Sequence, residues 1–251
     1  MTPEFDRDGV LAHRMVVQDL AEPLRKAVDC RILGLGLQNT PPGSGLTGVN
    51  ARTSQAARPV TELLDEGGPL VVVMATRGAP HLVSRSELPL LTAALFPCDA
   101  HEAAAVDEVT RAVRETANGK AISRPALSEA LNDKVADSLR VWCERRKARH
   151  VREGLFRMAS LQAGLELDTA AASPTTFRPS GVQLAAEPDR EQARVEVARR
   201  YIRFAGVARP ADLAAWLGYQ TGEIWATWNR LAEELTPCDV AGKRRWALTS
   251  E

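Results

Sequence analysis

The residues best suited to chemistry lie at two points in the first third of the chain. His81 follows the segment RGAP (77–80), whose residue types predict a hairpin tip between two apolar runs. A histidine at such a tip is suited to acid–base chemistry, because its ordinary pKa lies near neutrality. The alternative is a turn histidine that hydrogen-bonds to the backbone. Both interpretations need strands on either side to hold the turn.

Gln38 is the second point, in the glycine- and proline-rich segment LGLGLQNTPPGSG (33–45). This segment is not a phosphate loop, because it lacks the Gly-Lys-Ser/Thr ending and does not follow a strand. Asn39 and Thr40 are suited to local hydrogen bonds that cap a helix end. The segment is therefore either a structural turn or a site at which the side chain of Gln38 acts.

Two basic segments are candidates for contact with phosphate groups. The first contains Arg140, Arg145, Arg146, Lys147 and Arg149. The second contains Lys243, Arg244 and Arg245. We expect the first on the third helix of a helix-turn-helix unit, which enters a DNA groove, and the second on a wing hairpin. Because Glu144 and Glu153 are interspersed with the first segment, a solvated helical face is the alternative.

The composition is that of an ordinary globular protein. Of 251 residues, 45% are hydrophobic and 25% are charged, and 32 basic residues balance 32 acidic ones. Zero net charge lowers the expectation of tight duplex binding through phosphates, although a dipolar surface can carry a local basic groove. The apolar run PLVVVMA (69–75) is too short to span a membrane, and no signal peptide is evident. Four scattered cysteines without a CxxC pair predict a cytoplasmic location.

The elements that position these residues follow from a repeat. The segments RPALSEAL (124–131) and RPADLAAWL (209–217) share Arg-Pro-Ala and then an apolar helical pattern. Around the second copy, the pattern predicts helices over 189–204, 211–217 and 222–235, and a hairpin with a glycine turn over 238–248. Three helices followed by a hairpin are typical of a winged helix.

The rest of the chain predicts two further units. In the middle, helices are expected over 103–116, 124–131 and 136–149, and either a wing-like hairpin or a helix ending at Gly164 over 152–167. Before it, helices are expected over 10–20, 22–37 and 46–66, with a break near Pro59, then strands over 69–75 and 81–84 and a helix over 87–95. Most tryptophans fall on periodic helical faces and are expected in the core: Trp142, Trp216, Trp225 and Trp228.

The predicted fold is therefore mainly α with small β-hairpins, built as tandem winged-helix units in one compact body. The units are expected over 10–97, 101–168 and 189–251, with a connector over 169–188.

Four segments, in order along the chain, resemble one family. They are LGLGLQNTPPGSG (33–45), RGAPHLV (77–83), HVREGLFR (150–157) and RRYIRFAGVARPADLAAWL (199–217). Together they are similar to the tandem winged-helix DNA glycosylases related to AlkZ and YcaQ, which excise bulky or crosslinking N-alkylated bases. The resemblance implies a DNA-bound hydrolase that uses no metal or other cofactor.

The resemblance also implies roles for the residues around Gln38. Family members carry a Gln-apolar-Gln or Gln-apolar-Asp triplet after Gly-Leu, whose polar side chains position a water for attack on the sugar C1′. Gln38 matches the first position, whereas Asn39 replaces the apolar residue and Thr40 the second polar one. Threonine donates and accepts hydrogen bonds, but it cannot act as a carboxylate base. The candidate catalytic residues are Gln38, Thr40 and His81.

The expected function is DNA binding with a glycosylase-like role, on duplex DNA that includes damaged duplex. One alternative is a DNA-binding regulator or lesion sensor without catalysis, which the replacement by Thr40 favours. The other is a protein that binds or converts a small-molecule ligand in the cleft between units, which the zero net charge favours. None of the three involves a membrane or a metal.

Overall fold

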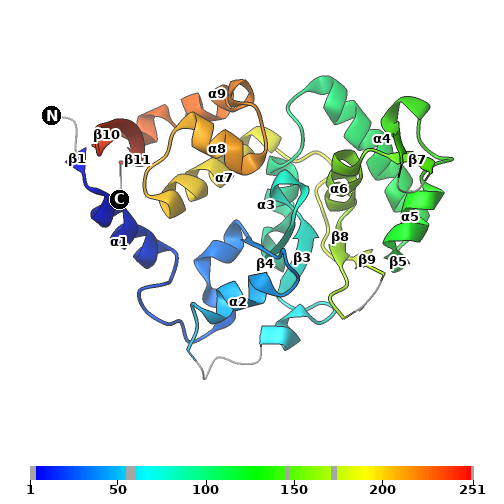
Figure 1. The fold of residues 1–251 in the computed structure, drawn as a ribbon, viewed down its shortest axis with the longest axis horizontal. Coiled ribbons are helices and arrows are strands. Elements are labelled where there is room, and N and C mark those ends of the chain that lie inside the picture. The colour runs from blue at the N-terminus through cyan, green and yellow to red at the C-terminus, as the bar shows by residue number, and fades with distance from the viewer. Residues whose placement is uncertain (1–3, 55–59, 145–146, 171–173, 250–251) are drawn as a thin grey trace.

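A computed structural model describes residues 4–54, 60–144, 147–170 and 174–249. These residues are mainly helical, as predicted, and their strands form three small three-stranded sheets and one two-stranded hairpin (Figure 1). None of the helices in these ranges is both long and apolar enough to cross a membrane.

The first sheet has the strand order β2–β4–β3 and carries both Gln38 and His81. The predicted hairpin is confirmed as β3 (Leu70–Met74) and β4 (Pro80–Ser84). β2 (Leu37–Gln38) pairs antiparallel with β4, which places Gln38 directly opposite His81. α2 (Ser44–Asn50) follows β2, and the predicted short helix after the hairpin is α3 (Leu88–Ala94).

The helix predicted over 22–37 is wrong. This segment forms two short 3-10 helices, Ala27–Asp29 and Arg31–Gly34, before β2 begins. The buried carboxylate of Asp19 accepts hydrogen bonds from the backbone N–H and Nε of Arg31, at 2.8 and 2.7 Å, and this anchor competes with a continuous helix. Over 46–66, α2 ends at Asn50 and the next described element is the 3-10 helix Val60–Leu64. The break expected near Pro59 lies outside the described residues.

The middle of the chain contains a second sheet, of order β5–β9–β8. Its elements are α4 (Ala100–Ala117), β5 (Ile122–Ser123), α5 (Arg124–Ala130), α6 (Glu153–Gln162), β8 (Leu165–Leu167) and β9 (Thr176–Pro179). α6 packs on α4, and Gly164 follows its end with a left-handed φ of 74°. Of the two alternatives for 152–167, the helix ending at Gly164 is therefore the one observed.

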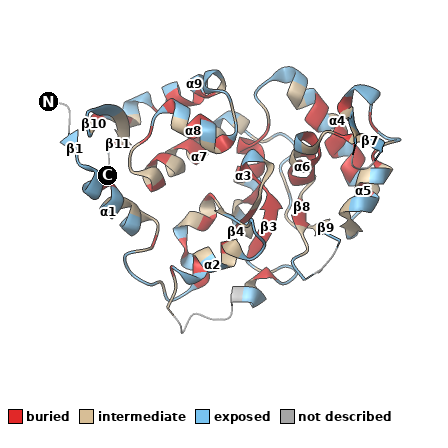
Figure 2. Cartoon of the chain, in the orientation of Figure 1, coloured by how far each residue is buried: buried red, intermediate tan, exposed pale blue. Residues whose placement is uncertain are grey.

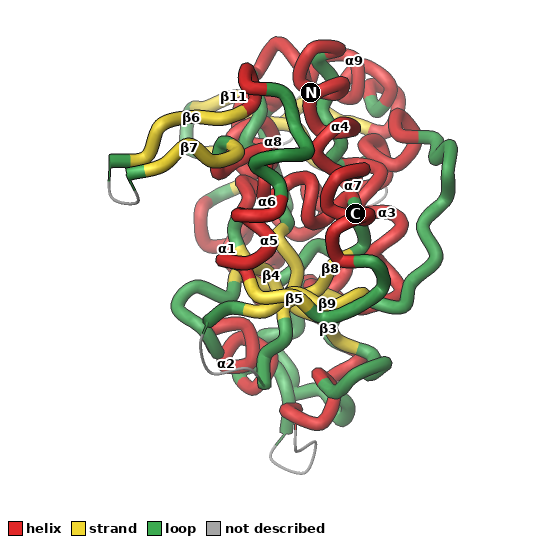
Figure 3. The backbone as a smooth tube through the Cα atoms, turned by 90° about the vertical axis from the view of Figure 1, so that its right-hand side faces the viewer, coloured by secondary structure: helices red, strands yellow, loops and turns green. Residues whose placement is uncertain are grey.

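The helix predicted over 136–149 is wrong. β6 (Arg140–Cys143) and β7 (Ala148–Val151) form a hairpin there, which extends away from the body in Figure 3. Val141 and Trp142 have side chains that favour strands, and the left-handed φ of 49° at Lys147 suits a reversal rather than a helix. The described residues of the first basic segment, Arg140, Lys147 and Arg149, thus lie on a projecting hairpin and not on a groove-entering helix.

The C-terminal elements agree with the prediction to within a few residues. They are α7 (Arg190–Ala205), α8 (Pro210–Leu217), α9 (Thr221–Arg230), β10 (Leu235–Val240) and β11 (Lys243–Leu248). Asp189 caps α7 by accepting a 2.9 Å hydrogen bond from the N–H of Gln192, and Gly218 ends α8 in the left-handed region.

The N-terminal elements pack on this C-terminal part, and β1 and α1 lie beside β10 and β11 in Figure 1. β1 (Glu4–Phe5) pairs parallel with β10. α1 (Arg7–Val17) is tied to the end of α7, where Arg14 Nε donates to Ala205 O at 2.7 Å and Gln18 Nε2 donates to Phe204 O at 2.9 Å. These bonds satisfy carbonyl groups that the end of a helix leaves unpaired.

Three apolar cores meet at β3, which is coloured as buried in Figure 2. All five residues of this strand are buried, because both of its faces are covered. Val71 and Val73 join the core around α3 and α7, Leu70 and Val72 join the core beneath α2, and Met74 joins the core of α4 and α6. The turn that follows β3 therefore continues from a strand that is packed into all three cores.

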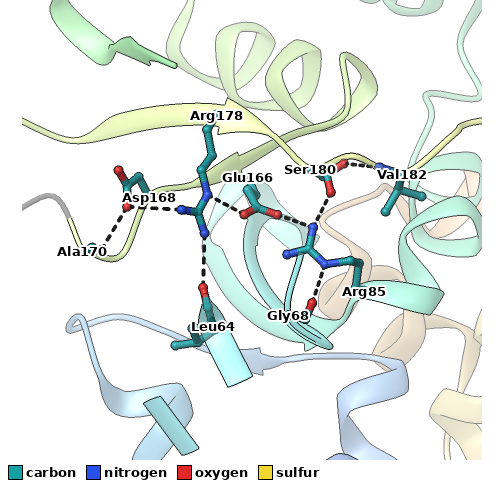
Figure 4. A network of polar contacts seen from close by, with 9 residues as sticks. All are labelled: Leu64, Gly68, Arg85, Glu166, Asp168, Ala170, Arg178, Ser180 and Val182. Carbon is teal, nitrogen blue, oxygen red and sulfur yellow. Dashed lines mark hydrogen bonds and ion pairs between the residues drawn. The ribbon is translucent and has the colours of Figure 1, made fainter. Parts of the chain in front are cut away.

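A buried ion-pair network joins the second sheet to the first (Figure 4). Glu166 on β8 is 2% exposed and accepts from Arg85 Nη1 and Arg178 Nε, both at 2.7 Å. Each arginine also binds a backbone carbonyl in the segment that leads into β3. Arg85 Nε lies 2.5 Å from Gly68 O, and Arg178 Nη2 lies 3.2 Å from Leu64 O. A second carboxylate, Asp168, lies 3.8 Å from Arg178 Nη1, so two cations face two anions, of which Glu166 is the enclosed one.

Candidate functional site

Gln38 presents its side chain to solvent from a firmly held backbone. Its carbonyl oxygen accepts a 3.0 Å hydrogen bond from Ser44 Oγ, and its backbone is paired with His81 in the sheet. The side-chain oxygen Oε1 lies 3.4 Å from Nη2 of Arg77. An exposed amide whose oxygen faces a guanidinium is oriented, and it keeps capacity to hydrogen-bond a further group such as water.

The next two residues of the triplet differ in their surroundings. Asn39 Oδ1 accepts from the backbone N–H of Gly43 and of Gly45, at 2.9 and 3.1 Å, and so anchors the start of α2. Asn39 therefore has the capping role expected of a structural turn, at the beginning of a helix rather than its end. Thr40 is exposed beside it.

His81 lies in the sheet, away from solvent. It is 3% exposed, its Nδ1 is 2.8 Å from Ala79 O, and its Nε2 is 3.1 Å from Thr76 Oγ1. Burial, opposed by the Ala79 hydrogen bond and aided by the charge of Arg77, holds the pKa of His81 below its usual value of 6.5. The neutral ring thus donates to Ala79 and accepts from Thr76, which matches the turn histidine of the two sequence alternatives.

Arg77 lies in the turn between β3 and β4, where distant segments converge. Its φ of 56° is left-handed, and a Cβ at Gly218, which follows the end of α8, would approach its Cγ to 3.0 Å. On the other side, Arg157 of α6 donates from Nη1 to Gly78 O at 3.0 Å. Close packing from α8 and α6 therefore fixes the residue that orients the Gln38 amide.

The β6–β7 hairpin places its described cations on an exposed ribbon. Arg140 pairs with Asp137, and Lys147 Nζ is 2.7 Å from Glu144 Oε2. Arg149 is exposed, and among the described residues it donates to the carbonyl of Arg140, at 3.3 Å. Arg145 and Arg146 lie outside the described residues.

The tryptophans divide between core and surface. Trp142 on this hairpin is 55% exposed and Trp225 is 50% exposed, so the core position expected for both is wrong. Trp228 is buried, and Trp216 is partly buried against Tyr201. For Trp142 the cause is the hairpin itself, since a two-stranded ribbon that projects from the body has no core of its own.

The second basic segment lies on β11. Lys243 and Arg244 are exposed, and the Arg244 guanidinium lies 5.4 Å from the ring centre of Trp246. Arg245 is half-buried and faces a cleft of about 610 Å³. The structure thus separates this segment into two outward cations and one that points into a cavity.

That cleft also collects arginines that sequence reasoning did not select. Its charged lining residues are Arg7, Arg14, Arg77, Asp212 and Arg245. The seven-residue spacing of Arg7 and Arg14 places both on one face of α1, which is a signal available from sequence. No spacing relates them to Arg77 or Arg245, because only the packing of α1 on α7 brings them together.

Two of three comparisons with known proteins found a match for this chain. The structure of Streptomyces sahachiroi DNA glycosylase AlkZ has a similar fold, with a TM-score of 0.72 at 20% sequence identity over 98% of this chain and 71% of that one. No curated protein matches the chain. The family model for DNA glycosylase AlkZ-like proteins matches residues 34–251, which include Gln38 and both basic segments. The chain therefore belongs to the AlkZ-like DNA glycosylase family.

Proposed function

We propose that this protein binds duplex DNA and hydrolyses the N-glycosidic bond of an alkylated or crosslinked purine, with Gln38 orienting the attacking water. The observation that carries this proposal is the exposed Gln38 side chain, whose oxygen is oriented by Arg77. Family membership supports DNA as the partner and base excision as the reaction class.

The reaction makes few demands on acid–base groups. A purine that carries a positive charge through N-alkylation leaves as a neutral base, and the bond from C1′ breaks with its electron pair on the base nitrogen. Water then adds to the oxocarbenium-like C1′, and its proton passes to solvent. Positioning and electrostatics can supply most of the rate of such a step.

Within this proposal the candidate residues have unequal roles. Gln38 Oε1 accepts a hydrogen bond from the water, and Thr40 adds a hydrogen bond of shorter reach. His81, which is buried and bonded at both ring nitrogens, is a positioning residue that holds the turn carrying Arg77. Acid–base work by His81 is not required.

The proposed scaffold is three winged-helix units, over 10–97, 101–168 and 189–251, joined by a connector over 169–188. In the middle unit, support comes from the order α4, β5, α5, α6, β8, β9, with β5 paired to the last strand. α7, α8, α9 and the β10–β11 hairpin support the last unit. The β6–β7 hairpin is then an insertion between the second and third helices of the middle unit.

This assignment moves the proposed DNA contact of the middle unit. α6 occupies the place of the recognition helix, yet Leu155, Phe156, Ala159 and Leu161 on it are all buried. A helix enclosed on these faces is unsuited to entering a groove, whereas an exposed two-stranded ribbon fits the major groove. The proposed phosphate contacts are Arg140, Lys147 and Arg149 on the hairpin, and Lys243, Arg244 and Arg245 on β11. Arg145 and Arg146, which lie outside the described residues, stay in the proposal on the sequence alone.

The test is base excision from a duplex that contains a single N7-methylguanine. After incubation, alkaline cleavage of abasic sites is quantified on a denaturing gel. We expect abasic product with the wild-type protein and a rate at least about 100-fold lower with Gln38→Ala. Gln183→Ala, which alters an exposed glutamine elsewhere, is the matched control and retains the wild-type rate. Absence of abasic product from the wild-type protein, with duplex binding intact, contradicts the proposal.

A DNA-binding protein without catalysis is the second candidate function, and the triplet favours it. Asn39 is engaged in capping α2, and Thr40 offers no carboxylate. In that case the wild-type protein binds duplex without forming abasic sites. Thr40→Asp then restores excision, whereas Thr47→Asp on α2 does not, and the comparison locates the missing group at position 40.

A further inference from the structure

The α1–α8 cleft is formed by three regions that are distant in sequence: the N-terminal helix, the turn between β3 and β4, and the C-terminal elements. Its lining residues come from α1, from the turn Thr76–Gly78, from α7 and α8, and from the β10–β11 hairpin, and they enclose about 610 Å³. Arg7 and Arg14 lie on α1, Arg77 on the turn and Arg245 on β11. Four guanidinium groups thus approach one space from different sides.

Four arginines and one aspartate line this cleft, so positive charge is in excess there, although Asp212, whose pKa is lowered mainly by its hydrogen bond from Arg209, also interacts with the charge of Arg245. No described carboxylate lies within 4.0 Å of the side-chain nitrogens of these four arginines. The one carboxylate among the lining residues, Asp212, is bound by Arg209, with Nη2 to Oδ1 at 2.7 Å and Nε to Oδ2 at 3.1 Å. Elsewhere, arginines such as Arg31, Arg199 and Arg230 pair with carboxylates. The cleft therefore has cations available for an anionic ligand.

Two of the four arginines are held before any ligand arrives. Nε of Arg14 donates to Ala205 O at 2.7 Å, so the outer end of its guanidinium remains for another acceptor. Arg77 is packed against Gly218 and reaches Gln38. Guanidinium groups fixed in this way suit phosphate oxygens, which they bind in a planar, often bidentate geometry.

The remaining wall of the cleft is apolar and aromatic. Tyr201 and Trp216 stack with ring centres 5.1 Å apart, and Leu11 on α1 is 53% exposed. Such a wall accepts the hydrophobic face of a sugar or base beside a bound phosphate. A simple inorganic anion would leave this surface uncovered.

We propose that the α1–α8 cleft binds the phosphate groups of the DNA strand that carries the target nucleotide, with Arg7, Arg14, Arg77 and Arg245 as ligands. The assignment of the ligand as a DNA strand rests on the proposed function. Arg77 links the two sites, because it lines the cleft and also contacts Gln38 Oε1. Phosphate binding in the cleft thus fixes the distance of the sugar from the Gln38 side chain.

The test is the salt dependence of binding to an undamaged duplex, measured by fluorescence anisotropy. Arg7→Gln and Arg245→Gln each remove one cation of the cleft, from α1 and from β11. In each variant we expect the magnitude of the slope of log K against log salt to fall by about 0.9. This change corresponds to roughly fivefold weaker duplex binding at 0.15 M salt. Arg230→Gln, whose arginine is exposed and paired with Glu191, is the matched control and keeps the wild-type slope. Unchanged slopes in both cleft variants overturn the proposal, provided that thermal unfolding shows both to be folded.

A phosphate group can also come from a free nucleotide, and deoxyadenosine monophosphate tests this source by competition. We expect it to displace duplex only at millimolar concentration, because one phosphate engages a fraction of the cleft. Micromolar binding that both cleft variants abolish, with duplex affinity unaffected, overturns the assignment to a DNA strand.

Because binding is measured with undamaged duplex, the test of the cleft is independent of whether the protein excises a base. Reduced slopes without abasic product from damaged duplex leave the cleft proposal standing and remove the glycosylase proposal. Abasic product with unchanged slopes does the reverse.

Discussion

Two arginine clusters in this molecule have opposite surroundings. Around Glu166, Arg85 and Arg178 are 14% and 16% exposed, share one buried carboxylate and bind backbone carbonyls. In the α1–α8 cleft, Arg7, Arg14, Arg77 and Arg245 face solvent without a carboxylate partner among the described residues. The first cluster holds two parts of the fold together, whereas the second has the composition of a binding surface.

This contrast changes what the zero net charge implies. Thirty-two cations and thirty-two anions cancel over the whole chain, but they are unevenly paired. Carboxylates such as Glu166, Glu196 and Glu234 are occupied by arginines inside or between elements. Neutral composition therefore coexists with a local positive field, and it does not argue against a polyanionic partner.

The largest expected effect comes from removing the carboxylate that Arg85 and Arg178 share. Glu166→Ala leaves two enclosed guanidinium groups without their shared anion, and we expect the free energy of unfolding to fall by about 3–5 kcal/mol. Urea denaturation measures it. Glu191→Ala, which removes an exposed partner of Arg230, serves as the control and costs at most about 1 kcal/mol. A loss below about 1 kcal/mol for Glu166→Ala would mean that the network does not join the two sheets.

The next prediction concerns the packing of Gly218 against Arg77, which we expect to position that arginine in the α1–α8 cleft. Gly218→Ala introduces a Cβ within 3.0 Å of the Arg77 Cγ at a φ of 84°, so it both strains the backbone and displaces Arg77. Gly119→Ala has similar strain, at a φ of 70°, but its Cβ meets nothing within 4 Å. Both variants should lose about 1 kcal/mol of stability. Only Gly218→Ala should also weaken duplex binding, and equal binding by the two contradicts a positioning role for α8.

Local sequence signals were sufficient to predict the C-terminal helices and the last hairpin. Asp189 and Gly218 mark the start of α7 and the end of α8, and the alternation around Ala241-Gly242 marks the last hairpin. The β6–β7 hairpin lacked such signals. Its strands have four residues each, too few for the strand preference of Val141 and Trp142 to exclude a helix, so only the pairing of β6 with β7 decides between them.

The candidate site shows the same division. The position of Gln38 follows from the family resemblance in one continuous segment. The cleft does not, because residues 7, 14, 77 and 245 come together only through α1 on α7 and the β3–β4 turn on α8. A single sequence carries no local record of such contacts between distant segments.

A smaller effect is expected at the exposed hairpin. Arg149→Gln removes a cation whose one described hydrogen bond is to a carbonyl, so stability should change little. If this residue contacts a phosphate, duplex affinity falls roughly fivefold at 0.15 M salt, as for a cleft arginine. Combining Arg149→Gln with Arg7→Gln should add the two losses, since the sites are independent. A double variant no weaker than either single one would indicate that hairpin and cleft do not bind the same duplex together.

The smallest expected effect is a pH dependence of stability that arises from His81, a buried residue in the strand next to Arg77. Its pKa in the folded protein is below 6.5, whereas the unfolded chain protonates near that value. Between these two pKa values the unfolded state binds a proton that the folded state does not, so stability is full above about pH 6.5 and falls as the solution is acidified. His81→Gln should flatten urea stability between about pH 7 and about pH 5.5, which is above the range where most carboxylates titrate. An unaltered pH profile in this variant would show that the ring is not held neutral, and that Thr76 and Ala79 do not fix the turn carrying Arg77.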